Sequence, residues 1–333
     1  MSVEDFLEEW KSDSPYVEVK TSGSTGEPKR MLVEKRRMIN SARITCDFLG
    51  LKPGDTALLC MSLDYIAGKM MVVRAMERNL NLVAVEPSGH PMGEMLNKKF
   101  KIENKKYSTD NIGFAAMVPM QVYNSLQVPE ERERLMQIKN LIIGGGAIDD
   151  GMAEELRSFP NAVWSTYGMT ETLSHIALRR LSGERASEWY EPFPGVRVSL
   201  NADRCLVIDA PEVCEETLVT NDIGEIDGSG MRFRILGRKD NVICSGGIKI
   251  QAEEVERMLK PYLDAPFIIS KRKDAKFGEI VVMLTEGDVI EAREVCERVL
   301  PKFQQPKDYI KVNSIPLTET GKPARKEAEK LAM

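Results

Sequence analysis

The chain has 333 residues, enough for two or three domains, and its 42% hydrophobic and 29% charged residues are typical of a globular protein. A net charge of −5 leaves no basic footprint and argues against nucleic acid as a partner. Six cysteines without a close pair favour a reducing compartment, and no apolar run approaches the roughly 20 residues of a membrane span. Because the N-terminus is acidic and lacks the features of a signal peptide, we expect a cytoplasmic protein.

The first distinctive segment, residues 21–29, combines hydroxyl side chains, two glycines and a lysine. Glycine N–H groups and hydroxyls can surround an anion, and a lysine adds a compact positive charge, so the segment suits a polyphosphate. It is not a Walker A loop, because no Gly-Lys-Ser/Thr follows at the required spacing. Taken alone, the segment would be read as a flexible linker.

Strands and helices alternate through the first half of the chain. We expect helices at 37–49, stopped by Gly50, and at 65–78, and strands at 56–61, 80–85, 112–118 and 141–143. This alternation predicts an α/β layer with a parallel sheet. Close-spaced strands at 196–198, 204–208, 217–220 and 231–236 predict a smaller antiparallel or barrel-like section. Helices at 252–260 and 289–300, with strands at 266–270 and 279–284, then predict a compact α+β unit.

A second cluster, residues 167–172, follows an expected strand at 162–165, where α/β sheets present ligand-binding groups. Tyr167 could stack on a base, Thr170 could contact a phosphate and Glu171 could bind Mg²⁺. The same residues also fit an ordinary helix start with Thr170 as its cap.

Three further signals lie downstream. Asp222 could accept hydrogen bonds from both ribose hydroxyls and Arg238 could reach the sugar or a phosphate, although a turn and a surface charge are alternatives. Gly246 and Gly247 indicate either a close backbone approach or a hairpin turn. Lys322, on a glycine-flanked loop, could be a cationic clamp for a distant site or a solvated lysine.

These clusters, in this order, resemble the adenylate-forming superfamily, which includes acyl-CoA synthetases, the adenylation domains of peptide synthetases and luciferases. The resemblance extends from about residue 19 to residue 326. It implies a large N-terminal α/β domain, residues 1–239, with a mainly parallel sheet and a β-rich section at about 195–239. A mobile α+β lid domain, residues 240–333, would follow, with Asp240 as the hinge.

The same resemblance implies ATP, Mg²⁺ and coenzyme A as ligands and assigns the site residues to them. The phosphate loop matches Thr21, Ser22, Gly23, Ser24, Thr25, Gly26 and Lys29; the adenine site matches Gly144, Gly145, Gly146, Tyr167 and Gly168; the ribose site matches Asp222 with Arg238. Thr170 matches a phosphate contact, Glu171 the magnesium ligand, Lys322 the lysine required for adenylation, and Gly246 with Gly247 the pantetheine tunnel.

Two segments bear on the identity of the acid substrate. Residues 62–68 take the place of the acyl-pocket motif and include Gly68, with Tyr65 where the family often has histidine. Residues 167–176 look similar to o-succinylbenzoate–CoA ligases of menaquinone biosynthesis, and Ser174 and His175 are candidate contacts of the acid. His175 is equally consistent with a surface histidine just past the motif.

The resemblance therefore predicts an acid–CoA ligase that forms an acyl-adenylate and then a thioester. An adenylating enzyme for another aromatic acid or a carrier-protein thiol, and a non-catalytic nucleotide-binding homologue, stay open as alternatives. Family members carry a long subdomain before the phosphate loop, and here 20 residues precede it. A homodimer or a minimal acid pocket would compensate for that difference.

Overall fold

The computed structural model describes residues 1–20, 30–96, 111–148, 150–318 and 323–333. The chain divides into two compact units. The first unit comprises Met1–Val198, Ile208–Leu218 and Asp227–Phe233, and the second comprises Ser199–Val207, Val219–Ile226 and Arg234–Met333. The predicted division into domains 1–239 and 240–333 stays a prediction, as does the rotation of the second domain about Asp240.

A seven-stranded sheet forms the centre of the first unit. Its strands are β3 (Thr56–Leu59), β4 (Asn81–Ala84), β5 (Phe114–Met117), β6 (Asn140–Ile143), β7 (Ala162–Gly168), β8 (His175–Arg180) and β9 (Glu191–Pro192). They lie in the order β4-β3-β5-β6-β7-β8-β9. The pairs from β4 to β7 are parallel, whereas β8 and β9 are antiparallel to their neighbours. The predicted mainly parallel α/β sheet is confirmed.

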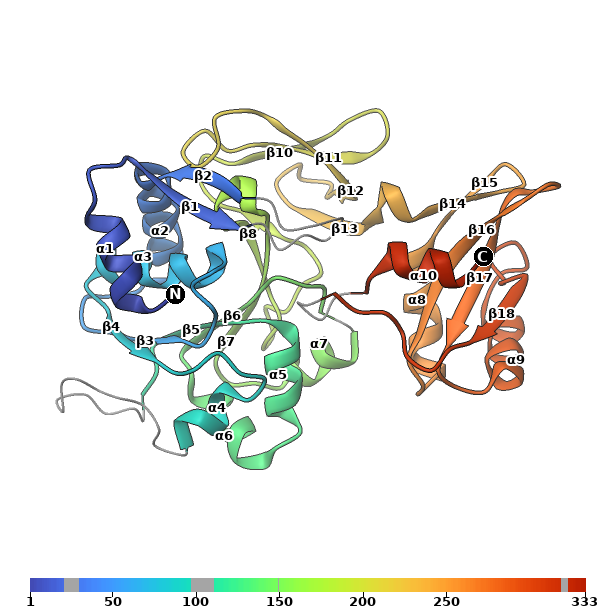
Figure 1. Cartoon of the computed structure of the whole chain (residues 1–333), viewed down its shortest axis with the longest axis horizontal. Coiled ribbons are helices and arrows are strands. Elements are labelled where there is room, and N and C mark those ends of the chain that lie inside the picture. Colours follow the sequence, from blue (N-terminus) through green and yellow to red (C-terminus); the bar gives the residue numbers. More distant parts are fainter. Residues whose placement is uncertain (21–29, 97–110, 149, 319–322) are drawn as a thin grey trace. The chain divides into compact units, whose positions relative to one another are not determined.

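Helices cover both faces of this sheet, which explains why β3, β5 and β6 are buried along their whole length. The helices are α1 (Val3–Lys11), α2 (Lys35–Leu49), α3 (Ile66–Arg78), α4 (Pro91–Leu96), α5 (Pro119–Leu126), α6 (Pro129–Gln137) and α7 (Asp150–Arg157). Figure 1 shows α2 and α3 on one side of the sheet and α4, α5 and α6 on the other. The predicted stop of α2 at Gly50 is confirmed, because this residue adopts a left-handed φ of 65°.

The N-terminal helix is fastened to α3 by a buried lysine. Lys69 is 2% exposed, and its Nζ donates to Glu9 Oε2 at 3.0 Å and to the Glu18 carbonyl at 2.7 Å. The same ammonium group lies 5.2 Å from the centre of the buried Phe6 ring. Glu18 belongs to a two-stranded antiparallel hairpin of β1 (Tyr16–Lys20) and β2 (Arg30–Glu34). Lys69 therefore joins α1, β1 and α3 at one point.

A four-stranded sheet follows in the chain. Its strands are β10 (Arg197–Leu200), β11 (Cys205–Asp209), β12 (Leu218–Ile226) and β13 (Phe233–Arg238), and they neighbour one another in chain order. Short connections between successive strands favour this order. The predicted β-rich section is confirmed as a sheet.

The C-terminal part forms a five-stranded sheet with helices on both faces. Its strands are β14 (Val242–Ser245), β15 (Ile248–Gln251), β16 (Phe267–Asp274), β17 (Gly278–Thr285) and β18 (Asp308–Lys311). Its helices are α8 (Ala252–Leu259), α9 (Val289–Val299) and α10 (Arg325–Leu331). Alternate residues of β17 point to opposite faces, so Val281 and Met283 pack with α8 and α9, whereas Val282 and Leu284 pack with α10. The predicted α+β unit is confirmed. No helix within the described ranges has the length and apolar character needed to cross a membrane.

Candidate active site

The predicted aromatic residue of the adenine site lies inside a strand. We expected the strand to end at residue 165, but β7 continues to Gly168, so Tyr167 is a strand residue and not a loop residue. Its ring is 7% exposed and packs against Phe233 and Tyr190, with ring centres 5.2 and 5.9 Å away. The alternative of a helix start is wrong, because Thr170–Thr172 forms a single 3₁₀ turn before β8. This turn leaves Glu171 exposed.

A strained turn connects Glu171 to β8. Leu173 is 2% exposed and has a φ of 64°, an uncommon conformation for a branched residue. Gly168 lies against this turn so closely that an added Cβ would be 2.1 Å from the Ser174 carbonyl oxygen. Packing therefore fixes the turn, and only glycine fits at position 168. The turn determines where Ser174 and His175 point.

The predicted Gly144, Gly145 and Gly146 turn follows β6 directly. An added Cβ on Gly144 would lie 2.3 Å from Thr166 Oγ1 on the neighbouring strand β7, and Gly145 has a φ of 82°. Because β6 and β7 are parallel, this turn and Tyr167 lie at the same carboxyl edge of the sheet. The structure thus brings the predicted adenine-site residues together.

A continuous chain of hydrogen bonds runs beneath this edge, and we call Thr45, Arg74, Ser174 and His175 the Arg74 cluster. Arg74 Nη2 donates to Ser174 Oγ at 2.8 Å, and Ser174 Oγ lies 3.1 Å from His175 Nδ1. His175 Nε2 lies 3.1 Å from Thr45 Oγ1, which donates to the Ser41 carbonyl at 3.0 Å. These directions assign the hydrogen to Nε2 of a neutral imidazole. The alternative of a surface histidine is wrong, because His175 is 6% exposed.

Arg74 is a buried cation without a carboxylate among the described residues. Its side chain on α3 is 2% exposed, and its Nε has no hydrogen-bond partner. Burial lowers the pKa of Arg74 to about 10. Burial, and then the nearby Arg74 charge, hold the pKa of His175 well below 6.5. A buried guanidinium without a carboxylate partner costs several kcal/mol of desolvation, so an anion bound beside it would offset that cost.

Sequence reasoning missed Arg74, although a signal was present. It is the one charged residue in the apolar run 70–75 of an expected helix. The predicted acid-site residues Tyr65 and Gly68 lie at the start of the same helix. Tyr65 is the N-cap of α3 and pairs with Lys20 in an isolated bridge, and a Cβ on Gly68 would lie 2.3 Å from the Ser62 carbonyl oxygen.

The predicted ribose and hinge residues come together in the second unit, and we call Asp222, Arg238 and Asp240 the Arg238 cluster. Arg238 Nη1 donates to Asp222 Oδ1 at 3.1 Å, and its Nη2 donates to Asp240 Oδ2 at 3.3 Å. Asn221 Nδ2 also donates to Asp240 Oδ2, at 3.2 Å. The side chain of Asp222 is 15% exposed, whereas those of Arg238 and Asp240 are 37% and 50% exposed.

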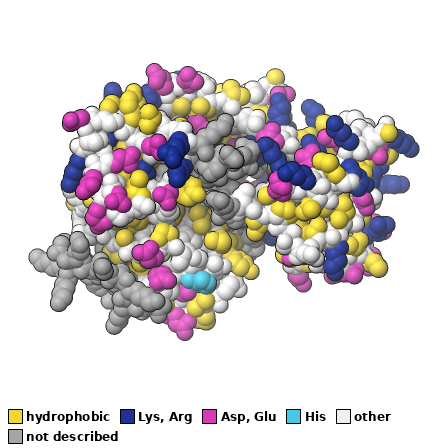
Figure 2. Space-filling view, in the orientation of Figure 1, with side chains coloured by type: hydrophobic (Ala, Val, Ile, Leu, Met, Phe, Trp, Pro, Cys, Tyr) yellow, Lys and Arg dark blue, Asp and Glu magenta, His cyan; other side chains and the backbone are white. Residues whose placement is uncertain are grey.

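Gly246 and Gly247 form a hairpin turn between β14 and β15, with φ angles of 59° and 83°. The backbone N–H of Gly246 donates to the Phe277 carbonyl at 2.8 Å. Two lysines lie over the Phe277 ring, Lys307 Nζ at 3.3 Å and Lys276 Nζ at 5.3 Å from its centre. We call Lys276, Phe277 and Lys307 the Phe277 face; sequence reasoning did not single it out. Figure 2 shows Lys and Arg side chains gathered over the end of the C-terminal unit that holds β15 and the β16–β17 hairpin.

Two predicted groups fall outside the described residues. They are the phosphate loop, with Thr21, Ser22, Gly23, Ser24, Thr25, Gly26 and Lys29, and the adenylation lysine, Lys322. Within the described part of the chain, no group of three or more His, Cys, Asp or Glu side chains could hold a metal ion. The single exposed carboxylate of Glu171 suits Mg²⁺, which commonly binds one or two carboxylates together with phosphate oxygens and water.

Residues 4–226 match the family model described as AMP-binding enzyme, and the chain belongs to this family. Two curated relatives are both named 2-succinylbenzoate–CoA ligase. The one from Lactococcus lactis is 23% identical over 92% of this chain and 69% of its own length, and the one from Salmonella typhimurium is 26% identical over 88% and 64%. The chain thus spans about two thirds of the length of these relatives.

Solved structures share the fold. An acyl-CoA synthetase (AMP-forming)/AMP-acid ligase II-like protein from Dyadobacter fermentans is 29% identical, with a TM-score of 0.64 over 99% of this chain and 93% of its own. The o-succinylbenzoate coenzyme A synthetase from Bacillus subtilis, in complex with ATP and magnesium ion, is 21% identical, with a TM-score of 0.73 over 93% and 69%. The match with the Dyadobacter protein thus covers nearly the whole of both chains.

Proposed function

We propose that this chain is an ATP-dependent acid–CoA ligase of menaquinone biosynthesis whose acid is 2-succinylbenzoate. It forms an acyl-adenylate and then an acyl-CoA thioester. Membership of the AMP-binding enzyme family and the names of the curated relatives support this proposal. The observation that carries the choice of acid is the buried guanidinium of Arg74, which has no carboxylate partner among the described residues.

2-Succinylbenzoate has two carboxylates, and adenylation consumes the charge of one of them. The other carboxylate stays anionic and requires a cation where it is held away from water. Arg74 is such a cation. The hydrogen bond from its Nη2 to Ser174 Oγ fixes the orientation of the guanidinium. The neutral His175 adds no second positive charge, so the cluster matches one carboxylate rather than a dianion such as a phosphate.

ATP would bind along the carboxyl edge of the large sheet. We assign the adenine to the Gly144, Gly145 and Gly146 turn and to Tyr167, and the ribose hydroxyls to Asp222. The phosphates are assigned to the loop at residues 21–29 and to Thr170. Glu171 would hold Mg²⁺, which neutralises charge on the phosphate oxygens when bound.

The reaction then takes two steps. A carboxylate oxygen of the acid attacks the α-phosphorus of ATP, the bond to the bridging oxygen breaks, and pyrophosphate leaves; Lys322 stabilises the charge that develops. The lid domain, residues 240–333, rotates about Asp240 and withdraws Lys322. The thiol of coenzyme A attacks the acyl carbonyl, loses its proton, and AMP leaves.

The Phe277 face suits the phosphorylated end of coenzyme A in the second step. Two ammonium groups over one aromatic ring provide charge for phosphates and a flat surface for a base. This face borders the Gly246 and Gly247 turn, which we assign to the pantetheine arm.

A cytoplasmic location is part of the proposal, and it is supported by the six cysteines, all of which are free thiols. A homodimer stays a prediction, and sedimentation velocity of the purified chain would test it.

The deciding experiment is a panel of acids in the exchange of labelled pyrophosphate into ATP, followed by addition of coenzyme A. We expect 2-succinylbenzoate to support the fastest exchange and to give a CoA thioester. Faster exchange with a monocarboxylic acid would refute the assigned acid. Exchange without formation of a CoA thioester would point to a carrier-protein thiol as the acceptor. If no acid supports exchange, the proposal that the chain is an adenylating enzyme is refuted.

A further inference from the structure

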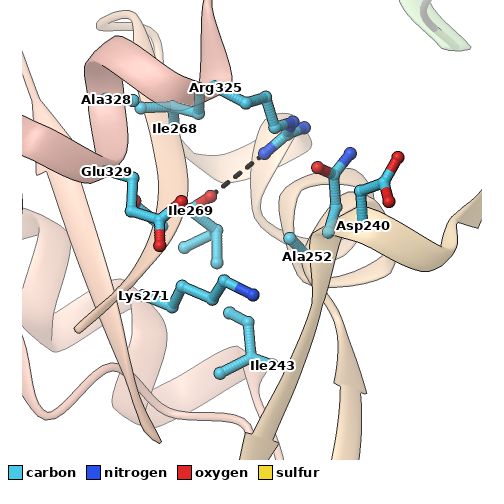
Figure 3. A pocket seen from close by; sticks show the side chains of 11 residues that line it. Asp240, Ile243, Ala252, Ile268, Ile269, Lys271, Arg325, Ala328 and Glu329 are labelled. Atoms are coloured by element: carbon cyan, nitrogen blue, oxygen red, sulfur yellow. Dashed lines mark hydrogen bonds between the residues drawn. The ribbon is translucent and has the colours of Figure 1, made fainter. Parts of the chain in front are cut away.

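A surface pocket in the second unit brings the hinge region and the start of α10 side by side. Asp240, Asn241, Ile269 and Arg325 are among the residues that line it. Figure 3 shows Arg325 and Asp240 at the same end of this pocket, with Arg325 reaching the carbonyl of Ile269. The hinge residue and the first residue of α10 thus share one small site.

Arg325 forms a bidentate ion pair with Glu256. Its Nη1 donates to Glu256 Oε1 at 2.9 Å and its Nη2 donates to Glu256 Oε2 at 2.7 Å, the bidentate arrangement of a strong pair. Arg325 Nη1 also donates to the Ile269 carbonyl at 3.0 Å, and the Ile269 N–H donates to Glu256 Oε1 at 2.8 Å. The two side chains, together with the N–H and the carbonyl of Ile269 on β16, form a closed ring of hydrogen bonds. Both side chains are less than a quarter exposed.

A second carboxylate extends this arrangement to the hinge. Arg325 Nη2 lies 4.0 Å from Glu253 Oε1, and Glu253 accepts hydrogen bonds from Asn241 Nδ2 and Gln251 Nε2. Gln251 Nε2 also donates to the Arg238 carbonyl at 3.0 Å. Glu253, Glu256 and Arg325, which we call the Arg325 network, therefore connect α10 to the Arg238 carbonyl and the Asn241 side chain, on either side of Asp240.

Just before α10, backbone contacts join residues 316–317 to residues 323–324. Leu317 and Pro323 form an antiparallel bridge, and the Ala324 N–H donates to the Pro316 carbonyl at 2.9 Å. Arg325 comes next in the chain, three residues after Lys322. The anchored residue is therefore close to this lysine in the sequence.

We propose that Arg325 is a positioning residue for adenylation, which holds the start of α10, three residues after Lys322 in the sequence, to Glu253 and Glu256. The inference rests on the proposed function, in which Lys322 serves the first step and is withdrawn for the second. Misplacement of a catalytic group by about 1 Å can cost about 100-fold in rate. Because the second step does not use Lys322, loosening the anchor affects adenylation alone.

The test compares the two half-reactions in the full chain with Arg325→Lys, which keeps the charge and loses the bidentate geometry. We expect acid-dependent pyrophosphate release to fall about 10- to 100-fold. Thioester formation from preformed acyl-adenylate should stay within about twofold. The matched control is Arg272→Lys, because Arg272 holds the other end of α10 through the Ala332 carbonyl at 3.3 Å and Asp308 at 2.7 Å. This control should leave both half-reactions within about twofold of the unmodified chain.

Equal losses in both half-reactions, or the same loss in Arg272→Lys, would overturn the positioning role. A readout that does not need activity separates this outcome from failure of the proposed function. Hydrogen exchange at the Ala324 amide should accelerate about 10-fold or more in Arg325→Lys and stay unchanged in Arg272→Lys. If no acid supports pyrophosphate release, the proposed function fails, and unchanged exchange at Ala324 would independently reject Arg325 as the anchor.

Discussion

The Arg74 cluster of the first unit and the Arg238 cluster of the second unit use charge in opposite ways. Arg74 is 2% exposed and unpaired with any carboxylate of the described chain, and a packed turn fixes its neighbour Ser174. Arg238 is 37% exposed and shares its donors between Asp222 and Asp240. Exposed ion pairs are worth about 0–1 kcal/mol, so Arg238 can exchange partners at little cost. A fixed buried charge suits selection of one ligand, whereas exchangeable pairs suit groups that take part in successive steps.

The strongest test of this division is Lys322→Ala, a change in the second unit. If Lys322 acts only in the first step, its loss should lower the rate of adenylation about 100- to 1,000-fold, as expected when a group that stabilises the transition state is removed. Transfer from preformed acyl-adenylate to coenzyme A should be nearly unaffected. Pyrophosphate exchange and single-turnover thioester formation measure the two steps. An equal loss of rate in both would contradict the claim that Lys322 acts in the first step alone.

The next largest effect is expected in the first unit, with Arg74→Met. Loss of a charged hydrogen bond to a carboxylate should lower kcat/KM for the acid about 10- to 100-fold. Because a buried unpaired charge is replaced by an apolar side chain of similar length, stability should stay the same or rise by about 1–4 kcal/mol.

Steady-state kinetics and urea denaturation distinguish a ligand-binding role of Arg74 from a structural one. A destabilised Arg74→Met with unchanged kcat/KM would show that the arginine serves the fold. Lys69→Met is a useful control on the same helix, because Lys69 is equally buried but has Glu9 as a partner. It should lose stability.

A smaller effect is expected on the Phe277 face. The double variant Lys276→Ala/Lys307→Ala should raise KM for coenzyme A about 5- to 10-fold, because surface charges contribute about 1 kcal/mol or less each. The effect should shrink at high salt. KM for ATP and the acid should not change, and an equal rise for ATP would place the nucleotide rather than coenzyme A on this face.

The smallest effect concerns the pH dependence of stability. His175 binds a proton in the unfolded chain below about pH 6.5 but stays neutral when folded, because burial and Arg74 lower its pKa. The unfolded state then binds more protons, so stability falls as pH drops below 6.5, by up to about 1.4 kcal/mol per pH unit. Urea denaturation between pH 7 and 5 should show a shallower slope in His175→Gln, and an identical slope would contradict the assignment.

Local patterns predicted the elements well because each was encoded by neighbouring residues. The left-handed Gly50 ends α2, and short continuous apolar runs mark β16 and β17. The site was harder to predict. Asp222 and Arg238 were paired correctly from their motifs, but the end of β7 was missed because the motif at Tyr167 looks like a loop while its backbone pairs with β8.

Arg74 shows why part of the site could not be predicted. An arginine in an expected amphipathic helix normally lies on the solvent face, and α3 buries it only because α2 and β8 cover that face with Thr45 and His175. These residues are 29 and 101 positions away in the chain, as their numbers show. The Phe277 face has the same origin, since Lys276 in the β16–β17 turn and Lys307 just before β18 meet at one ring.

The turn at Leu173, with its positive φ, has a consequence for redesigning the acid preference. Backbone packing against Gly168, rather than the side chain of Ser174, sets the direction of this turn. A library of variants at Thr45, Ser174 and Arg74 can therefore change the shape and charge of the acid site without changing the backbone of this turn. Position 173 should be excluded from such a library, because most branched replacements there would have to recover the same unfavourable φ.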